Sequence, residues 1–173
     1  MAVADPTLQL ERELFAGGAR FVIGCDEVGR GAIAGPVAVG VCAIDADVGP
    51  MPDGLRDSKM LSEKRREVLA PLATAWAVHC AVGLASALEV DRLGITACLG
   101  LAGKRALIAL HECGLSILDS VVLLDGHQDW LNPALAQPLA VHTRTKADRD
   151  CASVAAASVI AKVRSKTIRA ESR

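Results

Sequence analysis

The sequence predicts an α/β domain in which helices flank a five-stranded mixed sheet, and three observations lead to this prediction. The chain has 173 residues, enough for one domain with a sizeable core. Short apolar runs bounded by glycine, proline or aspartate alternate with longer helical segments, as expected where helices pack on a sheet. The hydrophobic residues are mostly Ala, Val, Leu and Ile, with two Trp, two Phe and no Tyr. We therefore expect residues 1–173 to form a single domain with an aliphatic core.

The first half of the chain predicts a short helix, a hairpin, a second helix and a third strand. After a helix over 8–15, an apolar run bounded by glycines predicts the first strand at 20–25. The second strand, 36–44, begins at a proline, where a missing N–H is tolerable. Ser and Glu at the start of 62–69 are typical of a helix N-terminus. Large apolar residues at every second position predict a strand over 76–84.

The second half predicts two helices, two further strands and a terminal helix. Capping-box spacing indicates a short helix within 86–94, and 96–113 is typical of a longer helix closed by glycine. Strands are expected at 121–124 and 140–143, separated by a proline-containing loop. An alanine-rich helix over 151–170 completes the mixed sheet and its flanking helices.

Charge is distributed unevenly along the chain. A formal net charge of −1 argues mildly against a nucleic-acid binder, because phosphate neutralisation usually leaves a basic signature. Residues 144–173, however, hold eight Lys or Arg against three acids, and residues 64–66 are all basic. A basic run can also be a solvated helix face. The basic C-terminal region keeps a nucleic-acid partner possible.

The cysteines and the N-terminus bear on the cellular compartment. The six cysteines lie far apart, without a Cys-x-x-Cys pair or a nearby His at ligand spacing, so we expect buried thiols in a reducing cytoplasm and no zinc site. Acidic residues occupy the N-terminus where a signal peptide would be basic. The apolar stretch 151–161 is too short to span a bilayer. The sequence thus predicts a soluble, cytoplasmic protein without a membrane partner.

Four acids stand where predicted strands end or turns begin. Asp26 and Glu27 follow the first strand, and both can serve one site if the chain turns immediately after Asp26. Asp125 ends a later strand, and Asp148 follows the last one. Four acids in one pocket would repel each other, and two divalent cations would remove that repulsion and could activate water for phosphodiester hydrolysis.

The loop beside the first acid pair favours close approach of a nucleic-acid backbone. In Gly29-Arg30-Gly31 the glycines expose backbone groups, and Arg30 adds donors for a phosphate. Adjacent to Asp26 and Glu27, such a loop could couple recognition of a ribose 2′-hydroxyl to cleavage.

Other polar and aromatic residues have more ordinary interpretations. His127 follows Asp125 closely enough for proton transfer but is more typical of a loop surface, and Trp130 can stack on a base or cover the core, the interpretation that we favour. Asp150 is expected to cap the last helix, and Asp57 to fix a turn. Two histidines inside predicted elements are expected to be structural: His79 and His111.

Five motifs, in order and at similar spacing, resemble those of the bacterial ribonuclease HII family. They span residues 24–163, and the first is highly specific. The motifs are Gly24-Cys25-Asp26-Glu27-Val28-Gly29-Arg30-Gly31, Asp57-Ser58-Lys59-Met60-Leu61-Ser62-Glu63-Lys64-Arg65, Leu124-Asp125-Gly126, Lys146-Ala147-Asp148 and Ala157-Ser158-Val159-Ile160-Ala161-Lys162-Val163.

The resemblance implies a ribonuclease H-like fold and an endonuclease that depends on Mn²⁺ or Mg²⁺. Such an enzyme hydrolyses the RNA strand of RNA–DNA hybrids, cuts 5′ to ribonucleotides embedded in duplex DNA, and leaves 3′-hydroxyl and 5′-phosphate ends. We expect a monomer that acts in ribonucleotide excision repair and DNA replication.

The resemblance also implies roles for individual residues. The catalytic and metal-binding acids are Asp26, Glu27, Asp125 and Asp148. The residues expected to contact the substrate are Gly29, Arg30, Gly31, Ser58, Lys59, Lys146, Ser158 and Lys162.

The chain departs from the family pattern in three places. Met60 stands where a second Lys is usual, and Arg164-Ser165-Lys166 replaces a Thr-Arg-Asp or Ser-Arg-Asp segment. By the resemblance, we expect this chain to lack the family's C-terminal helical segment, with a tyrosine that stacks on the substrate sugar, so that either the sequence is a fragment or substrate discrimination is weakened. An alternative is therefore a hybrid-binding module that cleaves poorly. A third alternative, a transposase-like nuclease with the same fold, accounts for the acids but not for the Gly-Arg-Gly loop.

Overall fold

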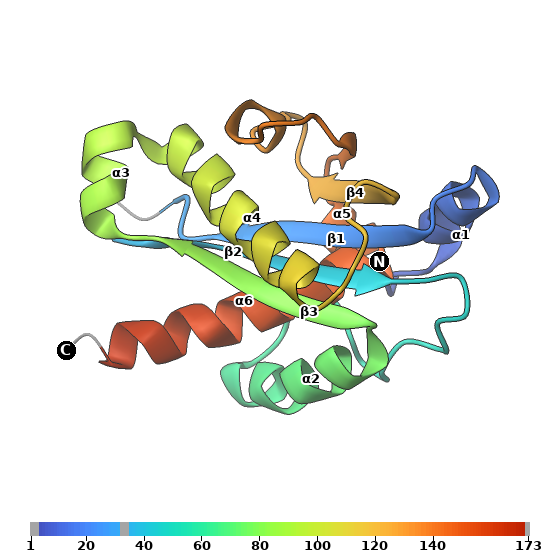
Figure 1. Ribbon diagram of the computed structural model, residues 1–173. Coiled ribbons are helices and arrows are strands. Elements are labelled where there is room, and N and C mark those ends of the chain that lie inside the picture. The colour runs from blue at the N-terminus through green and yellow to red at the C-terminus, as the bar shows by residue number, and fades with distance from the viewer. Residues whose placement is uncertain (1–3, 32–34, 172–173) are drawn as a thin grey trace.

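A mixed five-stranded sheet forms the centre of the protein (Figure 1), whose computed structural model describes residues 4–31 and 35–171. The strand order is β3-β2-β1-β4-β5, and β1, β2 and β3 form an antiparallel meander. β4 runs parallel to β1, and β5 runs parallel to β4. The strands are β1 (Phe21–Val28), β2 (Val37–Ile44), β3 (His79–Ala85), β4 (Ser120–Asp125) and β5 (Ala140–Arg144).

Helices cover both faces of the sheet, so the predicted fold class is confirmed. α4 packs on β2 and β3, while α6 crosses the opposite face beneath β1 and β2 and carries α2 on its side (Figure 1). The helices are α1 (Gln9–Ala16), α2 (Glu63–Trp76), α3 (Ala87–Leu93), α4 (Ile95–Glu112), α5 (Ala147–Asp150) and α6 (Ala152–Glu171), with 3₁₀ turns η1 (Ser58–Met60) and η2 (Asn132–Ala134).

The backbone of α6 lies directly against the sheet because both surfaces are made of small residues. A Cβ atom on Gly40 would lie 2.4 Å from the carbonyl oxygen of Ala157, and one on Gly24 would lie 2.2 Å from the backbone of Ser153. No side chain fits at either glycine without a shift of the helix. This close packing explains the alanine-rich sequence of α6 and brings the helix next to the end of β1.

Two expected boundaries between α2 and β3 were wrong. The helix expected over 62–69 continues to Trp76, past Pro71, and β3 starts at His79 rather than at 76. Leu69 and Ala73 are buried in the cluster that α2 forms with α6. The indole N–H of Trp76 donates to the Gly49 carbonyl at 2.9 Å, which holds the last turn. Tertiary burial therefore outweighs the local effect of the proline.

The expected core is largely confirmed. Trp130 is buried, with 3% of its surface exposed, as the core interpretation requires. The six cysteines are free, but Cys113 is exposed at the end of α4 and Cys80 is only partly buried, so the expectation that all six are buried was wrong for these two. Cys113 caps the C-terminus of α4, where the chain turns through Gly114, which has a φ of +91°. Within residues 4–31 and 35–171, no helix is both long and apolar enough to cross a membrane.

Candidate metal-dependent nuclease site

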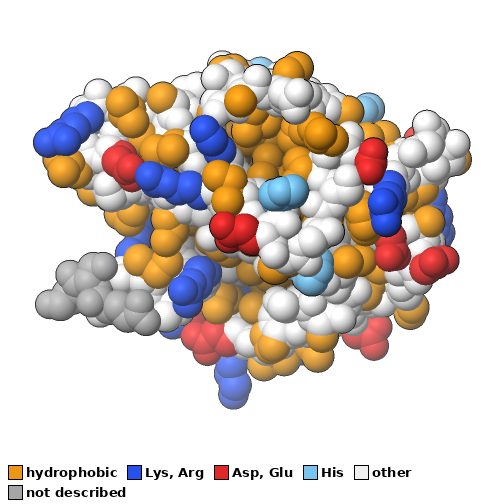
Figure 2. All heavy atoms as spheres, viewed as in Figure 1, with side chains coloured by type: hydrophobic (Ala, Val, Ile, Leu, Met, Phe, Trp, Pro, Cys, Tyr) orange, Lys and Arg blue, Asp and Glu red, His pale blue; other side chains and the backbone are white. Residues whose placement is uncertain are grey.

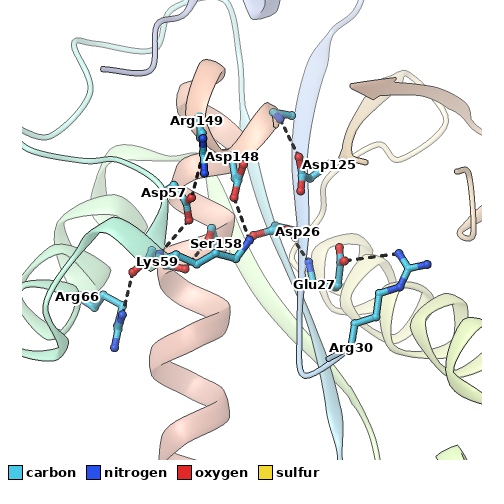
Figure 3. Close-up of polar contacts among 12 residues, drawn as sticks. Asp26, Glu27, Arg30, Asp57, Lys59, Arg66, Asp125, Asp148, Arg149 and Ser158 are labelled. Carbon is cyan, nitrogen blue, oxygen red and sulfur yellow. Dashed lines mark hydrogen bonds and ion pairs between the residues drawn. The ribbon is translucent and has the colours of Figure 1, made fainter. Parts of the chain in front are cut away.

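Three carboxylates meet where β1 and β4 lie side by side (Figure 3). One oxygen atom each of Asp26, Glu27 and Asp125 lies within 4.8 Å of the other two. The last registered pair of these parallel strands is Cys25 with Leu124, so Asp26 and Asp125 are the next residues on each strand. Parallel pairing thus places two acids from distant parts of the sequence at one edge of the sheet.

The turn expected immediately after Asp26 was wrong, since β1 continues to Val28 and pairs there with Ala38 of β2. Asp26 and Glu27 nevertheless both reach the cluster. β4 stops pairing with β1 at Cys25, which leaves that side of β1 without a strand partner next to the two acids. The Asp26 carboxylate also accepts a hydrogen bond from the Glu27 backbone N–H at 2.9 Å, and this bond holds the carboxylate close to the backbone of β1.

The fourth predicted acid lies beside this cluster on α5, a short helix that the sequence did not reveal. The Asp125 Oδ1 atom accepts a hydrogen bond from the Ala147 N–H at 2.7 Å, which ties α5 to the end of β4. Asp148 is buried, and its Oδ2 atom lies 3.5 Å from the Lys59 Nζ atom. The close group of three does not include Asp148, whose role as a metal ligand stays a prediction.

Burial and neighbouring negative charge raise the pKa values of Asp26, Glu27 and Asp148. Desolvation, followed by the charges of Glu27 and Asp125, raises the pKa of Asp26 well above its usual value. Burial is also the main cause that raises the pKa of Glu27. Burial, then the charges of Asp125 and Asp57, raise the pKa of Asp148 to about 6. The cluster therefore favours any partner that supplies positive charge.

The cluster fits a hard divalent cation. Its donors are all carboxylate oxygens, the ligands that Mg²⁺ and Mn²⁺ prefer. Within the described part of the chain, the Oε2 atom of Glu27 is buried without a hydrogen-bond partner. An unpaired buried carboxylate oxygen is costly unless a cation or proton neutralises it.

The Gly29-Arg30-Gly31 loop follows the acid pair directly and is built on a glycine-specific turn. Gly29 has a φ of +101°, and a Cβ atom there would lie 2.8 Å from the Pro36 carbonyl oxygen, so only glycine fits. Arg30 is exposed, and its guanidinium lies 3.8 Å from the Glu27 Oε1 atom. Gly31 is exposed as well. The loop thus presents a cation and open backbone beside the carboxylates.

The Ser58–Met60 turn lies on the other side of the cluster. Lys59 has 72% of its side chain exposed, and although burial lowers its pKa, the charges of Asp148, Asp26 and Asp57 raise it above the usual value. The hydroxyl groups of Ser58 and Ser158 are buried and hydrogen-bonded to each other at 2.8 Å. The two serines therefore join the turn to α6, and direct substrate contacts by them stay a prediction.

A groove of about 780 Å³ starts at Val28 and runs between α2 and α6. Lys162, Lys166 and Arg169 line it, and Lys166 is also paired with Glu63 and Glu67 of α2. Lys146 is exposed at the start of α5, and Arg173 lies outside the described residues. On the face shown in Figure 2, basic side chains are dispersed among acidic and apolar ones. That face therefore shows no continuous basic patch.

Three contacts around the site were not foreseen. Asp57, which caps the turn as expected, also forms an ion pair with Arg149 at 3.6 Å. Asp150 does not cap α6, because it lies within α5 and pairs with Arg144 at 2.8 Å. The first turn of α6 is capped instead by the buried Glu11, whose Oε1 atom accepts from the Ser153 N–H at 2.9 Å. The contacts of Asp57 with Arg149 and of Glu11 with Ser153 join residues too far apart in the sequence for local spacing to reveal.

Comparison with known proteins assigns the fold to the ribonuclease H enzymes. The ribonuclease H2 of Pyrococcus horikoshii has a TM-score of 0.68 and 28% identity, covering 87% of this chain and 74% of that one. Bst-RNase HIII in complex with Mn²⁺ has a TM-score of 0.66 at 24% identity and covers 87% of this chain and 53% of that one, which supports the fold alone.

The sequence comparisons identify the family. Residues 23–172 match the family described as Ribonuclease HII. Ribonuclease HII of Streptomyces avermitilis is 46% identical over 99% of this chain and 69% of the relative, and that of Paracoccus denitrificans is 43% identical over 91% and 70%. The chain belongs to the ribonuclease HII family and is a ribonuclease H.

Proposed function

We propose that this protein is an endonuclease that hydrolyses the RNA strand of RNA–DNA hybrids and cuts 5′ to single ribonucleotides in duplex DNA. The observation that supports this most is the contact between the carboxylate cluster and the Gly29-Arg30-Gly31 loop, which puts a loop suited to a sugar–phosphate backbone beside a site suited to cations. The same chemistry would leave 3′-hydroxyl and 5′-phosphate ends.

Asp26, Glu27, Asp125 and Asp148 would hold two Mn²⁺ or Mg²⁺ ions, which when bound activate water and stabilise the leaving oxygen. The protein's own groups orient the substrate. Arg30 and Lys59 flank the acids from opposite sides and can each donate to a phosphate of the scissile strand. Lys162 lines the groove between α2 and α6 and could bind a further phosphate of the same strand there.

The remaining parts of this proposal concern partners and location. We propose that the protein acts as a monomer on hybrids and ribonucleotide-containing DNA, in repair and replication. The free cysteines support a reducing, cytoplasmic environment.

Cleavage assays with defined duplexes test the proposal. Purified protein with Mn²⁺ or Mg²⁺ is given an RNA–DNA hybrid, a DNA duplex with one ribonucleotide and an all-DNA duplex. We expect cuts in the hybrid and on the 5′ side of the ribonucleotide only. Asp26→Asn should lower kcat by roughly a hundredfold or more, because it removes a charge from the cluster.

Asp91→Asn is the matched control, since Asp91 is exposed on α3, and it should cut at the normal rate. Cutting of the all-DNA duplex, or full activity of Asp26→Asn, would overturn the proposal. Metal-dependent hybrid binding without any cutting would instead identify a binding module.

A further inference from the structure

Asp57 is a buried carboxylate next to the site that is not part of the cluster of three acids. Asp57 lies in the loop before η1, and only 1% of its surface is exposed. Its Oδ1 atom accepts a hydrogen bond from the Lys59 N–H at 2.9 Å, and its Oδ2 atom lies 3.6 Å from the Arg149 Nε atom (Figure 3). Both oxygens are therefore engaged by the protein itself.

These two contacts belong to a closed ring of four residues, linked through side chains, one backbone N–H and one peptide bond. Arg149 and Asp148 are neighbours on α5, and Asp148 lies 3.5 Å from the Lys59 Nζ atom. Lys59 in turn follows Asp57 by two residues. The ring therefore joins the η1 turn to α5 across about ninety residues of sequence. Within the ring, only the Asp57 side chain contacts both elements, Lys59 of η1 and Arg149 of α5.

The turn that Asp57 caps is held from other sides as well. The Arg66 guanidinium donates to the carbonyl oxygens of Ser58 and Leu61, at 2.8 and 2.9 Å. On the outer side, Arg56 pairs with Asp5 at 2.5 Å. The turn thus has enough support to fold without Asp57. Loss of Asp57 should therefore change the position of the Lys59 side chain and of α5 before it unfolds the turn.

We propose that Asp57 is a positioning residue that sets where Lys59 and Asp148 lie in the site. The inference rests on the proposed function, in which Asp148 binds a metal ion and Lys59 contacts the substrate. The hydrogen bond that Asp57 accepts from the Lys59 N–H fixes the turn, and the ion pair of Asp57 with Arg149 fixes α5. An acid in this place acts through its neighbours, as residues behind metal ligands commonly do.

Four variants separate the two contacts: Asp57→Asn, Asp57→Ala, Arg149→Gln and the double variant Asp57→Asn with Arg149→Gln. Asparagine keeps an oxygen for the Lys59 N–H but loses the ion pair, whereas alanine loses both. Asp53→Asn is the matched control because Asp53 is exposed in the same loop. The measurements are Mn²⁺ affinity of the substrate-free protein by calorimetry, kcat and KM on an RNA–DNA hybrid, and the Tm.

Asp57→Asn and Arg149→Gln should each weaken Mn²⁺ binding and lower kcat by about tenfold, with KM unchanged. The double variant should be no worse than either single one, because both remove the same ion pair. Asp57→Ala should in addition raise KM, since Lys59 is released. Asp53→Asn should behave like the unaltered protein.

Normal Mn²⁺ affinity and kcat in Asp57→Asn would overturn the inference, and so would losses that add in the double variant. Asparagine is nearly isosteric with aspartate, so this variant is informative even if the alanine variant does not fold. Failure of the unaltered protein to cut any hybrid would refute the proposed function instead, while the Mn²⁺ affinities would still decide the role of Asp57.

Discussion

At the scale of single residues, the acids of the site couple metal binding to pH. Burial and neighbouring charge raise the pKa of Asp148 from 3.8 to about 6, and those of Asp26 and Glu27 are also raised. The folded, metal-free protein therefore binds protons more tightly than the unfolded chain. The stability from these groups is fully present below their unfolded pKa values and is lost as pH rises through the folded ones.

A divalent cation should reverse this loss, because it replaces the protons that leave at higher pH. We expect Mn²⁺ to raise the Tm clearly at pH 8 and much less at pH 5, as measured by thermal unfolding at both values. Asp148→Asn should reduce the difference between the two pH values. An equal rise in Tm at pH 5 and pH 8 would contradict this origin of the effect.

Local spacing predicted Asp26, Glu27 and Asp125 because glycines and apolar runs mark the ends of their strands. The structure brings these three together. Asp57 and Arg149 show the limit of such reasoning, since their ion pair depends on how η1 and α5 pack in space. Nothing in the sequence around either residue indicates its partner.

At the scale of elements, the contact between α6 and the sheet depends on the absence of side chains. Gly40→Ala would place a Cβ atom 2.4 Å from the Ala157 carbonyl oxygen and 2.8 Å from the Ala161 Cβ atom. We expect this variant to lose roughly 1–3 kcal/mol of unfolding free energy, because the helix must move away from β2. Urea denaturation measures the loss.

Gly49→Ala is the control for Gly40→Ala. A Cβ atom on Gly49 would have no heavy atom within 4 Å, and the backbone there is not in the left-handed region. Its stability should therefore stay within about 0.5 kcal/mol of the unaltered protein. Equal stability of the two variants would show that α6 adapts without cost.

Helix and strand types could be predicted from periodicity, but some ends and one helix could not. α2 extends past Pro71 because its buried face rests on α6, which is far away in sequence. The four-residue α5 has no amphipathic period of its own and exists because Asp125 accepts the Ala147 N–H. Tertiary contacts therefore decide these features, and local sequence does not carry them.

At the scale of the whole molecule, Glu11 joins the two ends of the chain. It lies on α1, is fully buried, and accepts from both the N–H and the hydroxyl of Ser153, at 2.9 and 2.8 Å. Glu11→Ala would leave these buried donors unpaired, and we expect it to cost roughly 1–3 kcal/mol of unfolding free energy. Urea denaturation is again the measurement.

Glu13→Ala tests whether any acid on α1 has this effect. Glu13 is exposed, and among the hydrogen bonds of the described residues its side chain accepts only from the nearby side chain of Gln9, so its loss should change stability little. Glu11→Gln keeps an acceptor for Ser153 and should retain most of the stability. Loss of the same size in the Glu11 and Glu13 alanine variants would contradict a specific cap on α6.

The mixed sheet could be predicted from the order of elements, but the strand order could not. The hairpin of β1 and β2 and the neighbouring β3 follow from adjacency along the chain. The position of β4 beside β1 brings residues about a hundred positions apart into register. Only the shared carboxylates hinted at this pairing.

That strand order also sets a sequence of events during synthesis on the ribosome. The β1–β3 meander is complete once residue 85 has emerged, yet the edge of β1 that receives β4 stays open until residues 120–125 follow. Asp148 and its ion-paired neighbour come later still. A growing chain therefore holds Asp26 and Glu27 well before Asp125 emerges, and the cluster of three carboxylates can assemble only after β4 has paired with β1.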